Sequence, residues 1–179
     1  TDESKTGIAR YNDVKITNCY VKDVKRAGIV VGYTYQHSKF NGAQIADETV
    51  QKYGHTNIYI ADNYVQNSGN DAIVAMYAYR PVIERNISDT AGVDLDDGYA
   101  GYWQSFCATI WPWKTKDAVF QYNEAFDTVG EGNGDGQAWD IDWSDGTVYQ
   151  YNYSHNNGGG SMLICLNEAY NGTFRYNLS

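Results

Sequence analysis

Short segments in which apolar and polar residues alternate recur along the chain, and each carries an asparagine after its apolar positions. Alternation with a period of two is typical of β-strands, because successive side chains point to opposite faces. The segments are VKITNCYV, IYIADNYV, VIERNIS, VFQYNEAF, VYQYNYSH and TFRYNLS, with the asparagines at Asn18, Asn63, Asn86, Asn123, Asn152 and Asn177. Successive asparagines lie 45, 23, 37, 29 and 25 residues apart, and the shorter spacings suit one coil of a repeating β structure.

The repeat predicts an all-β fold, a parallel β-solenoid. Asparagines stacked one strand spacing apart can hydrogen-bond to one another, so we expect an asparagine ladder along one bend of the coils. Turns also favour asparagine, but six recurrences in the same apolar frame favour the ladder.

A second strand is expected after each bend, and four of these strands align on a small first residue: GIVVG from Gly28, AIVAM from Ala72, AWDID from Ala138 and SMLIC from Ser161. The alignment predicts two inward rows, formed by Ile29, Ile73, Trp139 and Met162 and by Val31, Ala75, Ile141 and Ile164. It turns the alternate positions outward, including Asp140 and Asp142.

Two segments do not fit the coil pattern and are predicted to be loop insertions, residues 33–55 and 94–116. Loops on a rigid scaffold often carry binding residues. The second segment holds Trp103, Trp111 and Trp113, which either pack under their own loop or form a wall on which sugars stack.

The composition of the chain argues against several classes of partner and site. The net charge of -9 argues against a nucleic-acid partner, and no apolar run is long enough to span a bilayer. Three cysteines without CxxC spacing support neither a disulfide framework nor a zinc site. The 179 residues suit a single domain, 1–179. Because the coil pattern begins and ends in mid-coil, we expect a fragment of a longer β-helix, or one completed by another chain.

The stretch DGQAWDIDWSDG, residues 135–146, carries the candidate chemistry. Glycoside hydrolysis needs two carboxyl groups, about 5–5.5 Å apart for retention and about 6.5–9.5 Å apart for inversion. Asp140 and Asp142, on one strand face, would have Cα atoms roughly 6.5–7 Å apart. Asp135 lies in the preceding glycine bend and could fold back to meet one of them.

Calcium is the second interpretation of this stretch. Glu131, Asn133, Asp135 and Asp142 echo the spacing of a calcium loop, although both end positions deviate from the usual residues. Calcium could also assist a polysaccharide lyase, for which Arg80, Lys114 and Arg175 are the basic candidates. A third interpretation is a binding or structural solenoid without catalysis. Asp145, before a glycine, fits a turn, and His155 could reach the acidic face from the next coil.

The run GDGQAWDIDWSDGTVYQYNYSHNNGGGSMLIC, residues 134–165, resembles the right-handed parallel β-helix carbohydrate enzymes, and most closely the lacto-N-biosidase type of glycoside hydrolase. In that family the catalytic aspartates are seven positions apart, as Asp135 and Asp142 are. The resemblance implies that Asp142 is the nucleophile and Asp135 the acid/base of a retaining hydrolase, with Asp140 holding a substrate hydroxyl or tuning the pair.

The expectations for partners follow from this resemblance. The substrate would be an oligosaccharide or polysaccharide, with Trp143 and the tryptophans of the second segment as sugar platforms. No cofactor is expected unless the calcium interpretation holds. The resemblance implies a bacterial protein that acts outside the cell or on its surface.

Overall fold

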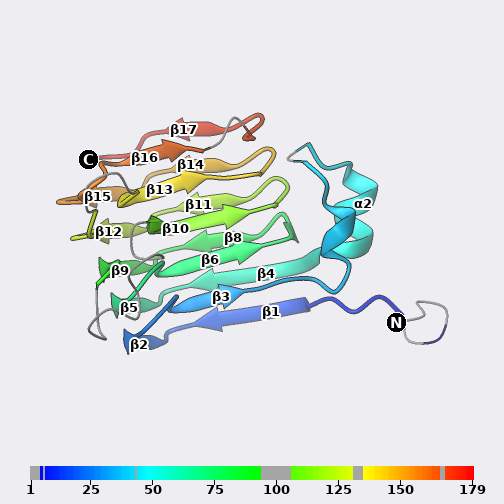
Figure 1. Ribbon diagram of the computed structural model, residues 1–179, viewed down its shortest axis with the longest axis horizontal. Coiled ribbons are helices and arrows are strands. Elements are labelled where there is room, and N and C mark those ends of the chain that lie inside the picture. Colours follow the sequence, from blue (N-terminus) through cyan, green and yellow to red (C-terminus); the bar gives the residue numbers. More distant parts are fainter. Residues whose placement is uncertain (1–4, 6, 43, 94–105, 131–134, 166–167) are drawn as a thin grey trace.

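The chain stacks its strands coil upon coil into three parallel β-sheets, from the N-terminal coil in blue to the C-terminal coil in red (Figure 1). The computed structural model describes residues 5, 7–42, 44–93, 106–130, 135–165 and 168–179. Every pairing between named strands is parallel, and neighbouring strands come from successive coils. This all-β, solenoid-like arrangement agrees with the fold class expected from the repeat.

Five successive coils each contribute one strand to each sheet, and two further strands belong to sheet 1 alone. Sheet 1 contains β1 (Asn12–Thr17), β4 (His55–Ala61), β7 (Ala78–Tyr79), β8 (Val82–Glu84), β11 (Val119–Gln121), β14 (Val148–Gln150) and β17 (Thr173–Arg175). Sheet 2 contains β2 (Tyr20–Val24), β5 (Tyr64–Ser68), β9 (Ile87–Ala91), β12 (Glu124–Phe126) and β15 (Tyr153–His155). Sheet 3 contains β3 (Ile29–Val31), β6 (Ile73–Met76), β10 (Ala108–Trp113), β13 (Gln137–Ile141) and β16 (Met162–Ile164).

The register predicted for the strands of sheet 3 is confirmed. Ile29 pairs with Ile73, and Trp139 pairs with Met162. The core is formed by side chains that the strands of all three sheets bury between them, among them Ile73, Trp139 and Tyr149, each 0% exposed. Asp140 is therefore held on the opposite face of β13 from Trp139.

Five asparagine side chains form a continuous hydrogen-bonded row along the bend between sheets 1 and 2. The amide of each donates to the side-chain oxygen of the next, over 2.9–3.1 Å, in the order Asn63, Asn86, Asn123, Asn152 and Asn177. Asn18, which the repeat predicts to join this row, does not belong to it. The pairing of β1 with β4 places Cys19 beside Asn63, whose side-chain oxygen accepts from the Cys19 backbone amide.

The prediction of an insertion over residues 94–116 is wrong for its last part. Residues 108–113 form β10, a regular strand between β6 and β13. Pro112 lacks an N–H group, but it lies opposite Ala75 on the inward side and the strand pairs around it. Residues 94–105 lie outside the described part of the chain.

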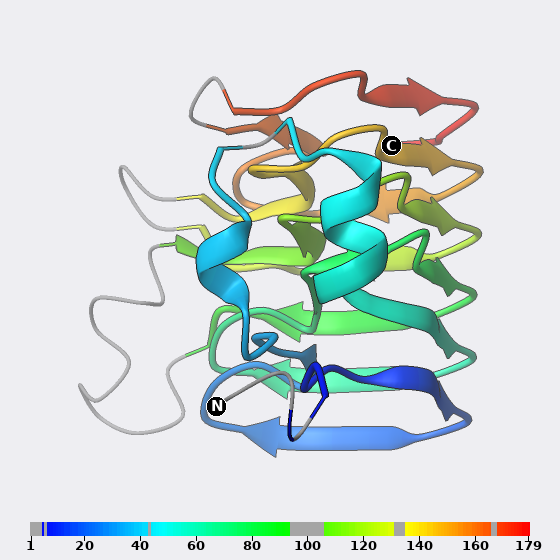
Figure 2. The same ribbon diagram turned by 90° about the vertical axis from the view of Figure 1, so that its right-hand side faces the viewer.

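The segment 33–54 does leave the coil, as predicted, and the next strand starts at His55. It contains a 3-10 helix, η1 (His37–Lys39), and the helix α2 (Asp47–Tyr53), which lies beside the coils at one end of their strands (Figure 2). Phe40, Ile45 and Val50 pack with Tyr77 into a second, smaller core. The Lys114 ammonium donates to the carbonyl oxygens of Phe40 (2.9 Å) and Gly42 (3.2 Å), which fastens this segment to the coils.

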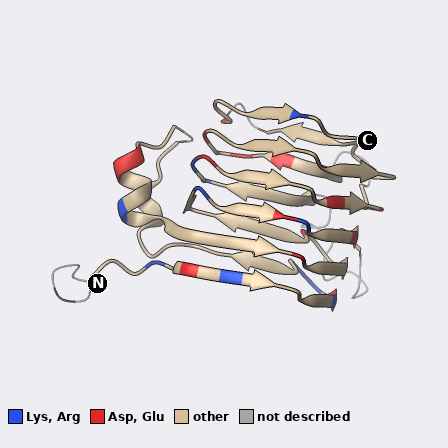
Figure 3. Cartoon of the chain, turned by 180° about the vertical axis from the view of Figure 1, so that it is seen from behind, with Lys and Arg blue, Asp and Glu red and all other residues tan. Residues whose placement is uncertain are grey.

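Charged positions are spread over the coils rather than gathered in one patch on the side seen from behind (Figure 3). Among the described residues, no helix has the length and apolarity needed to cross a membrane.

Candidate active site

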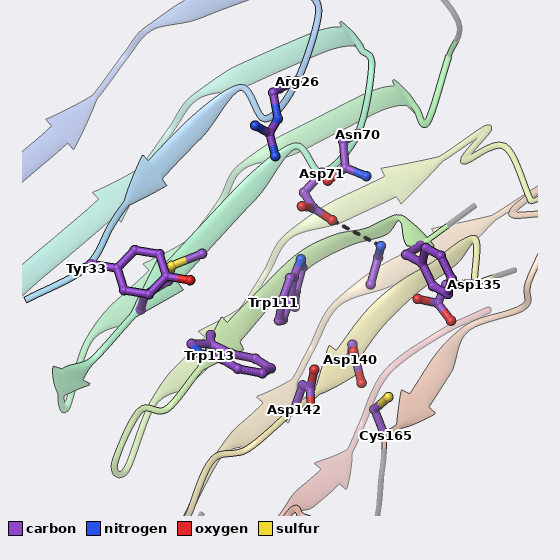
Figure 4. Close-up of a pocket in the computed structure, with 13 residues that line it drawn as sticks. Arg26, Tyr33, Asn70, Asp71, Trp111, Trp113, Asp135, Asp140, Asp142 and Cys165 are labelled. Atoms are coloured by element: carbon purple, nitrogen blue, oxygen red, sulfur yellow. Dashed lines mark hydrogen bonds between the residues drawn. The ribbon is translucent and has the colours of Figure 1, made fainter. Parts of the chain in front are cut away.

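Asp140 and Asp142 lie at the carboxyl end of β13, on the face of sheet 3 that points away from the core (Figure 4). Each is nevertheless buried, with Asp140 4% and Asp142 7% exposed. One side-chain oxygen of each, Oδ1, has no hydrogen-bond partner among the described residues. Two adjacent carboxylates held in this way are costly to the fold, so their burial calls for a functional explanation.

Two tryptophans from the neighbouring coil flank these aspartates. Ile110 pairs with Trp139 and Trp113 bridges to Asp142, which places the outward residues of β10 next to those of β13. The ring centroids of Trp111 and Trp113 are 6.1 Å apart and their planes are nearly perpendicular, at 88°. The apolar rings restrict water around the carboxyl groups and offer surfaces against which a sugar can stack.

Asp135 reaches the same region from the glycine bend that precedes β13. Gly136 has a φ of +98°, and a Cβ there would lie 2.6 Å from the Cα of Gly130. Its amide donates to the Cys107 carbonyl (2.6 Å) and its carbonyl accepts from Gly159 (2.9 Å). Only glycine allows this close stacking of backbones, and the stacking fixes the position of Asp135.

These groups line one pocket of about 640 Å³. This volume lies within the usual range for small-ligand sites. The lining residues are Arg26, Tyr33, Asn70, Asp71, Met76, Phe106, Ala108, Trp111, Trp113, Asp135, Asp140, Asp142 and Cys165. Figure 4 shows Asp140, Asp142 and Cys165 together at one end of the pocket, with Arg26 and Tyr33 away from them.

The carboxyl groups of the pocket have raised pKa values. Burial raises the pKa of Asp140 to about 8, and the negative charge of Asp142 adds to the effect. Burial raises the pKa of Asp142 to about 6, where the charge of Asp135 raises it further and that of Lys114 opposes the rise. Burial also raises the pKa of Asp135. Near pH 7 the pocket therefore holds a protonated Asp140 beside a mostly ionised Asp142.

Asp71 is a residue of this pocket that sequence reasoning missed. It is 7% exposed, it precedes β6, and its side chain accepts a hydrogen bond from the Ala108 backbone amide (3.2 Å). Burial raises its pKa to about 7. The alignment of strands on Ala72 could have found it, because Asp71 is the residue immediately before that anchor.

The other residues singled out from the sequence lie elsewhere. Trp143 does not line the pocket but lies beside it, with its ring 5.9 Å from that of Trp113. His155 lies on β15 of sheet 2, near Glu124, and does not line the pocket. Asp145 is bound by Lys116 (2.6 Å) and Asn171 (2.8 Å). Trp103, Glu131 and Asn133 lie outside the described residues.

The three basic residues considered for a lyase all make interactions in the structure. Arg80 pairs with Asp117 (3.3 Å) and Arg175 donates to Gln150. Lys114 alone of the three influences a pocket carboxylate, Asp142, although it donates to two carbonyl oxygens of the 33–54 segment.

The chain is similar to part of two lacto-N-biosidases. It is 47% identical to the lacto-N-biosidase of Bifidobacterium longum subsp. longum over 182 aligned residues, which cover 96% of this chain and 11% of that protein. No family model matches the chain.

The second relative has a solved structure. The crystal structure of the native GH136 lacto-N-biosidase from Eubacterium ramulus superposes with a TM-score of 0.89 at 46% identity, covering 99% of this chain and 29% of that one. The selenomethionine derivative of the same enzyme gives a TM-score of 0.87. The chain therefore spans less than a third of the length of either relative.

Proposed function

We propose that this chain carries the hydrolytic site of a retaining glycoside hydrolase of lacto-N-biosidase type, built on a right-handed parallel β-helix. The observation that carries the proposal is the pocket that Asp135 and Asp142 line together with Trp111 and Trp113. The chain is similar over nearly its whole length to two lacto-N-biosidases, and this similarity supports the same function.

In the proposed mechanism Asp142 is the nucleophile. Its ionised carboxylate attacks the anomeric carbon while the bond to the leaving oxygen breaks, and Asp135 gives its proton to that oxygen. A water molecule then attacks the anomeric carbon, Asp135 takes a proton from this water, and the bond to Asp142 breaks. Two displacements at one carbon retain its configuration. The mechanism requires the two carboxyl groups to come within about 5–5.5 Å of each other in the complex.

The neighbouring residues have supporting roles in this proposal. Asp140, which is protonated near pH 7, can donate a hydrogen bond to a substrate oxygen. The tryptophans provide the stacking surface. Since the relatives are much longer, we propose that further substrate contacts come from segments outside this chain. Because an oligosaccharide or polysaccharide substrate of this kind occurs outside the cell, we propose an extracellular or cell-surface location.

The direct test replaces each carboxylate by its amide in the full-length protein, with lacto-N-tetraose as substrate. We expect Asp142→Asn to lower kcat/KM by ~10³-fold or more, since the nucleophile is lost. Asp135→Asn should lower it by ~10²–10⁴-fold. Asp127→Asn is the matched control, because this exposed aspartate has a φ of 55°, which asparagine adopts readily. Wild-type rates in both pocket variants would refute the assignment.

A chelator separates hydrolysis from the calcium-assisted lyase alternative. EDTA should not lower kcat/KM, because no step of the proposed mechanism uses a metal. The lyase would lose its rate on chelation and would release an unsaturated sugar, which absorbs in the ultraviolet.

A further inference from the structure

Three side chains from neighbouring coils converge at one end of the pocket: Asp140, Asp142 and Cys165. One potential ligand atom from each lies within 4.8 Å of the other two. Cys165 directly follows β16, and its backbone amide donates to the Ile141 carbonyl (3.2 Å), which holds it beside the aspartates. Figure 4 shows the three side chains gathered together.

The two carboxylates have unused hydrogen-bonding capacity. Oδ1 of Asp140 and Oδ1 of Asp142 have no partner among the described residues, and both side chains are more than nine-tenths buried. Lys114, whose charge acts on Asp142, directs its ammonium to the Phe40 and Gly42 carbonyls. Buried oxygens that lack a partner attract a cation from solution.

We propose that Asp140, Asp142 and Cys165 form a binding site for a thiophilic divalent cation such as Zn²⁺, and that the bound cation inhibits hydrolysis. Two carboxylate oxygens and one thiolate are ligands that zinc accepts, and the open fourth position would face the pocket. Tetrahedral zinc ligands lie roughly 3.5 Å apart, so small side-chain rotations close the site. Calcium prefers oxygen ligands only and is disfavoured here by the sulfur.

Binding changes the protonation of the ligands. Burial raises the pKa of Cys165 to about 12, and the nearby aspartates add to this effect. The thiol must therefore release its proton to solvent as the cation binds, together with the proton of Asp140 where it is present. The charge of the cation reverses the local field and favours both ionised forms.

The binding test needs no glycan. Zn²⁺ is titrated into the full chain by calorimetry, and Cd²⁺ is titrated while the thiolate-to-cadmium charge-transfer absorption is recorded. We expect saturable binding of one cation, with a charge-transfer band. Cys165→Ser should abolish the band, and Asp140→Asn should weaken binding by ~10-fold or more, the loss caused even by removing a supporting hydrogen bond around a metal.

Cys19→Ser is the matched control, since Cys19 is an exposed free cysteine outside the pocket. This variant should retain both the affinity and the band. No saturable binding by the wild-type chain, or a band that survives Cys165→Ser, would overturn the site.

The inhibitory arm rests on the proposed function. Saturating Zn²⁺ should lower the hydrolysis rate of the wild-type protein at least ~10-fold. The hydrolysis rate of Cys165→Ser should be nearly the same with and without Zn²⁺. If Zn²⁺ binds as described and the rate does not fall, inhibition is wrong and the site stands. If the protein hydrolyses no glycan, the proposed function fails while the binding result still decides the metal site.

Discussion

Asp140 shows most clearly that single residues of the pocket serve a task other than stability. It is 4% exposed, it shares its surroundings with Asp142, and one of its oxygens has no partner among the described residues. A carboxyl group in such a place destabilises the folded state whenever it is ionised.

We therefore predict that Asp140→Asn stabilises the protein at alkaline pH. Because the folded-state pKa is raised to about 8 from an ordinary value of 3.8, the wild-type protein loses stability as pH rises between these values. The variant should be more stable by about 1–3 kcal/mol at pH 8 and nearly equal at pH 4. Thermal unfolding across this range measures the difference. A gap that does not depend on pH would contradict the account.

Lys114 is predicted to set the ionisation of Asp142. Its charge lowers the pKa of Asp142, which burial otherwise raises, so its removal should raise that pKa above about 6. In Lys114→Met the acidic limb of kcat/KM, which requires ionised Asp142, should move to higher pH. Lys114→Arg keeps the charge and should restore the wild-type limb. An unchanged limb in Lys114→Met would show that the lysine only fastens the 33–54 segment.

At the scale of elements, the register between coils builds the site. The alternation of residues was enough to predict the inward and outward faces of β13, because Trp139 and Ile141 are apolar and both aspartates are not. The sequence did not reveal that Trp111 and Trp113 lie on a strand beside them. Residues 94–105, which precede that strand, do not fit the coil pattern, and the pattern alone does not separate the strand from them. The sequence did not indicate Asp71 as a pocket residue either, because its place in the pocket depends on which coil stacks next to its own.

The asparagine row is also an element whose energetics can be tested. Asn123 accepts from the backbone and side-chain amides of Asn86, and its own side chain donates to Asn152 and to the Ile83 carbonyl. Asn123→Ala leaves several of these buried groups unpaired and should lower the free energy of unfolding by about 2–4 kcal/mol. Asn177→Ala, at the partly exposed end of the row, should cost less. Equal losses in denaturant unfolding would argue against a cooperative row.

The offset at Asn18 has a simple physical cause. Its segment resembles the others in sequence, but the pairing of Val14 with Ile58 sets the register, and this places Cys19 where the later coils have asparagine. Apolar side chains on the buried face fixed the alignment, since a one-residue slip would have turned that face outward.

The glycine bend provides a second test at this scale. A Cβ on Gly136 would collide with Gly130 and demand a strained backbone, so Gly136→Ala should displace Asp135. We expect kcat to fall by ~10²-fold, because small misplacements of a catalytic group cost this much, while Zn²⁺ affinity at Asp140 is retained. Steady-state kinetics and calorimetry on the same sample separate the two effects.

For the molecule as a whole, the solenoid-like stack acts as a rigid frame on which outward side chains from successive coils form the pocket. The similarity to two lacto-N-biosidases covers almost all of this chain and less than a third of either relative. For this segment we propose a chemistry in which Asp142 attacks the sugar and Asp135 transfers the proton.

The configuration of an azide adduct tests that claim most directly. Asp142→Ala in the full-length protein, supplied with azide and an aryl glycoside of lacto-N-biose, leaves a space in which azide replaces the missing nucleophile. We predict a glycosyl azide of inverted anomeric configuration by NMR, and one of retained configuration from Asp135→Ala. A retained product from Asp142→Ala would contradict the assignment of Asp142 as the nucleophile.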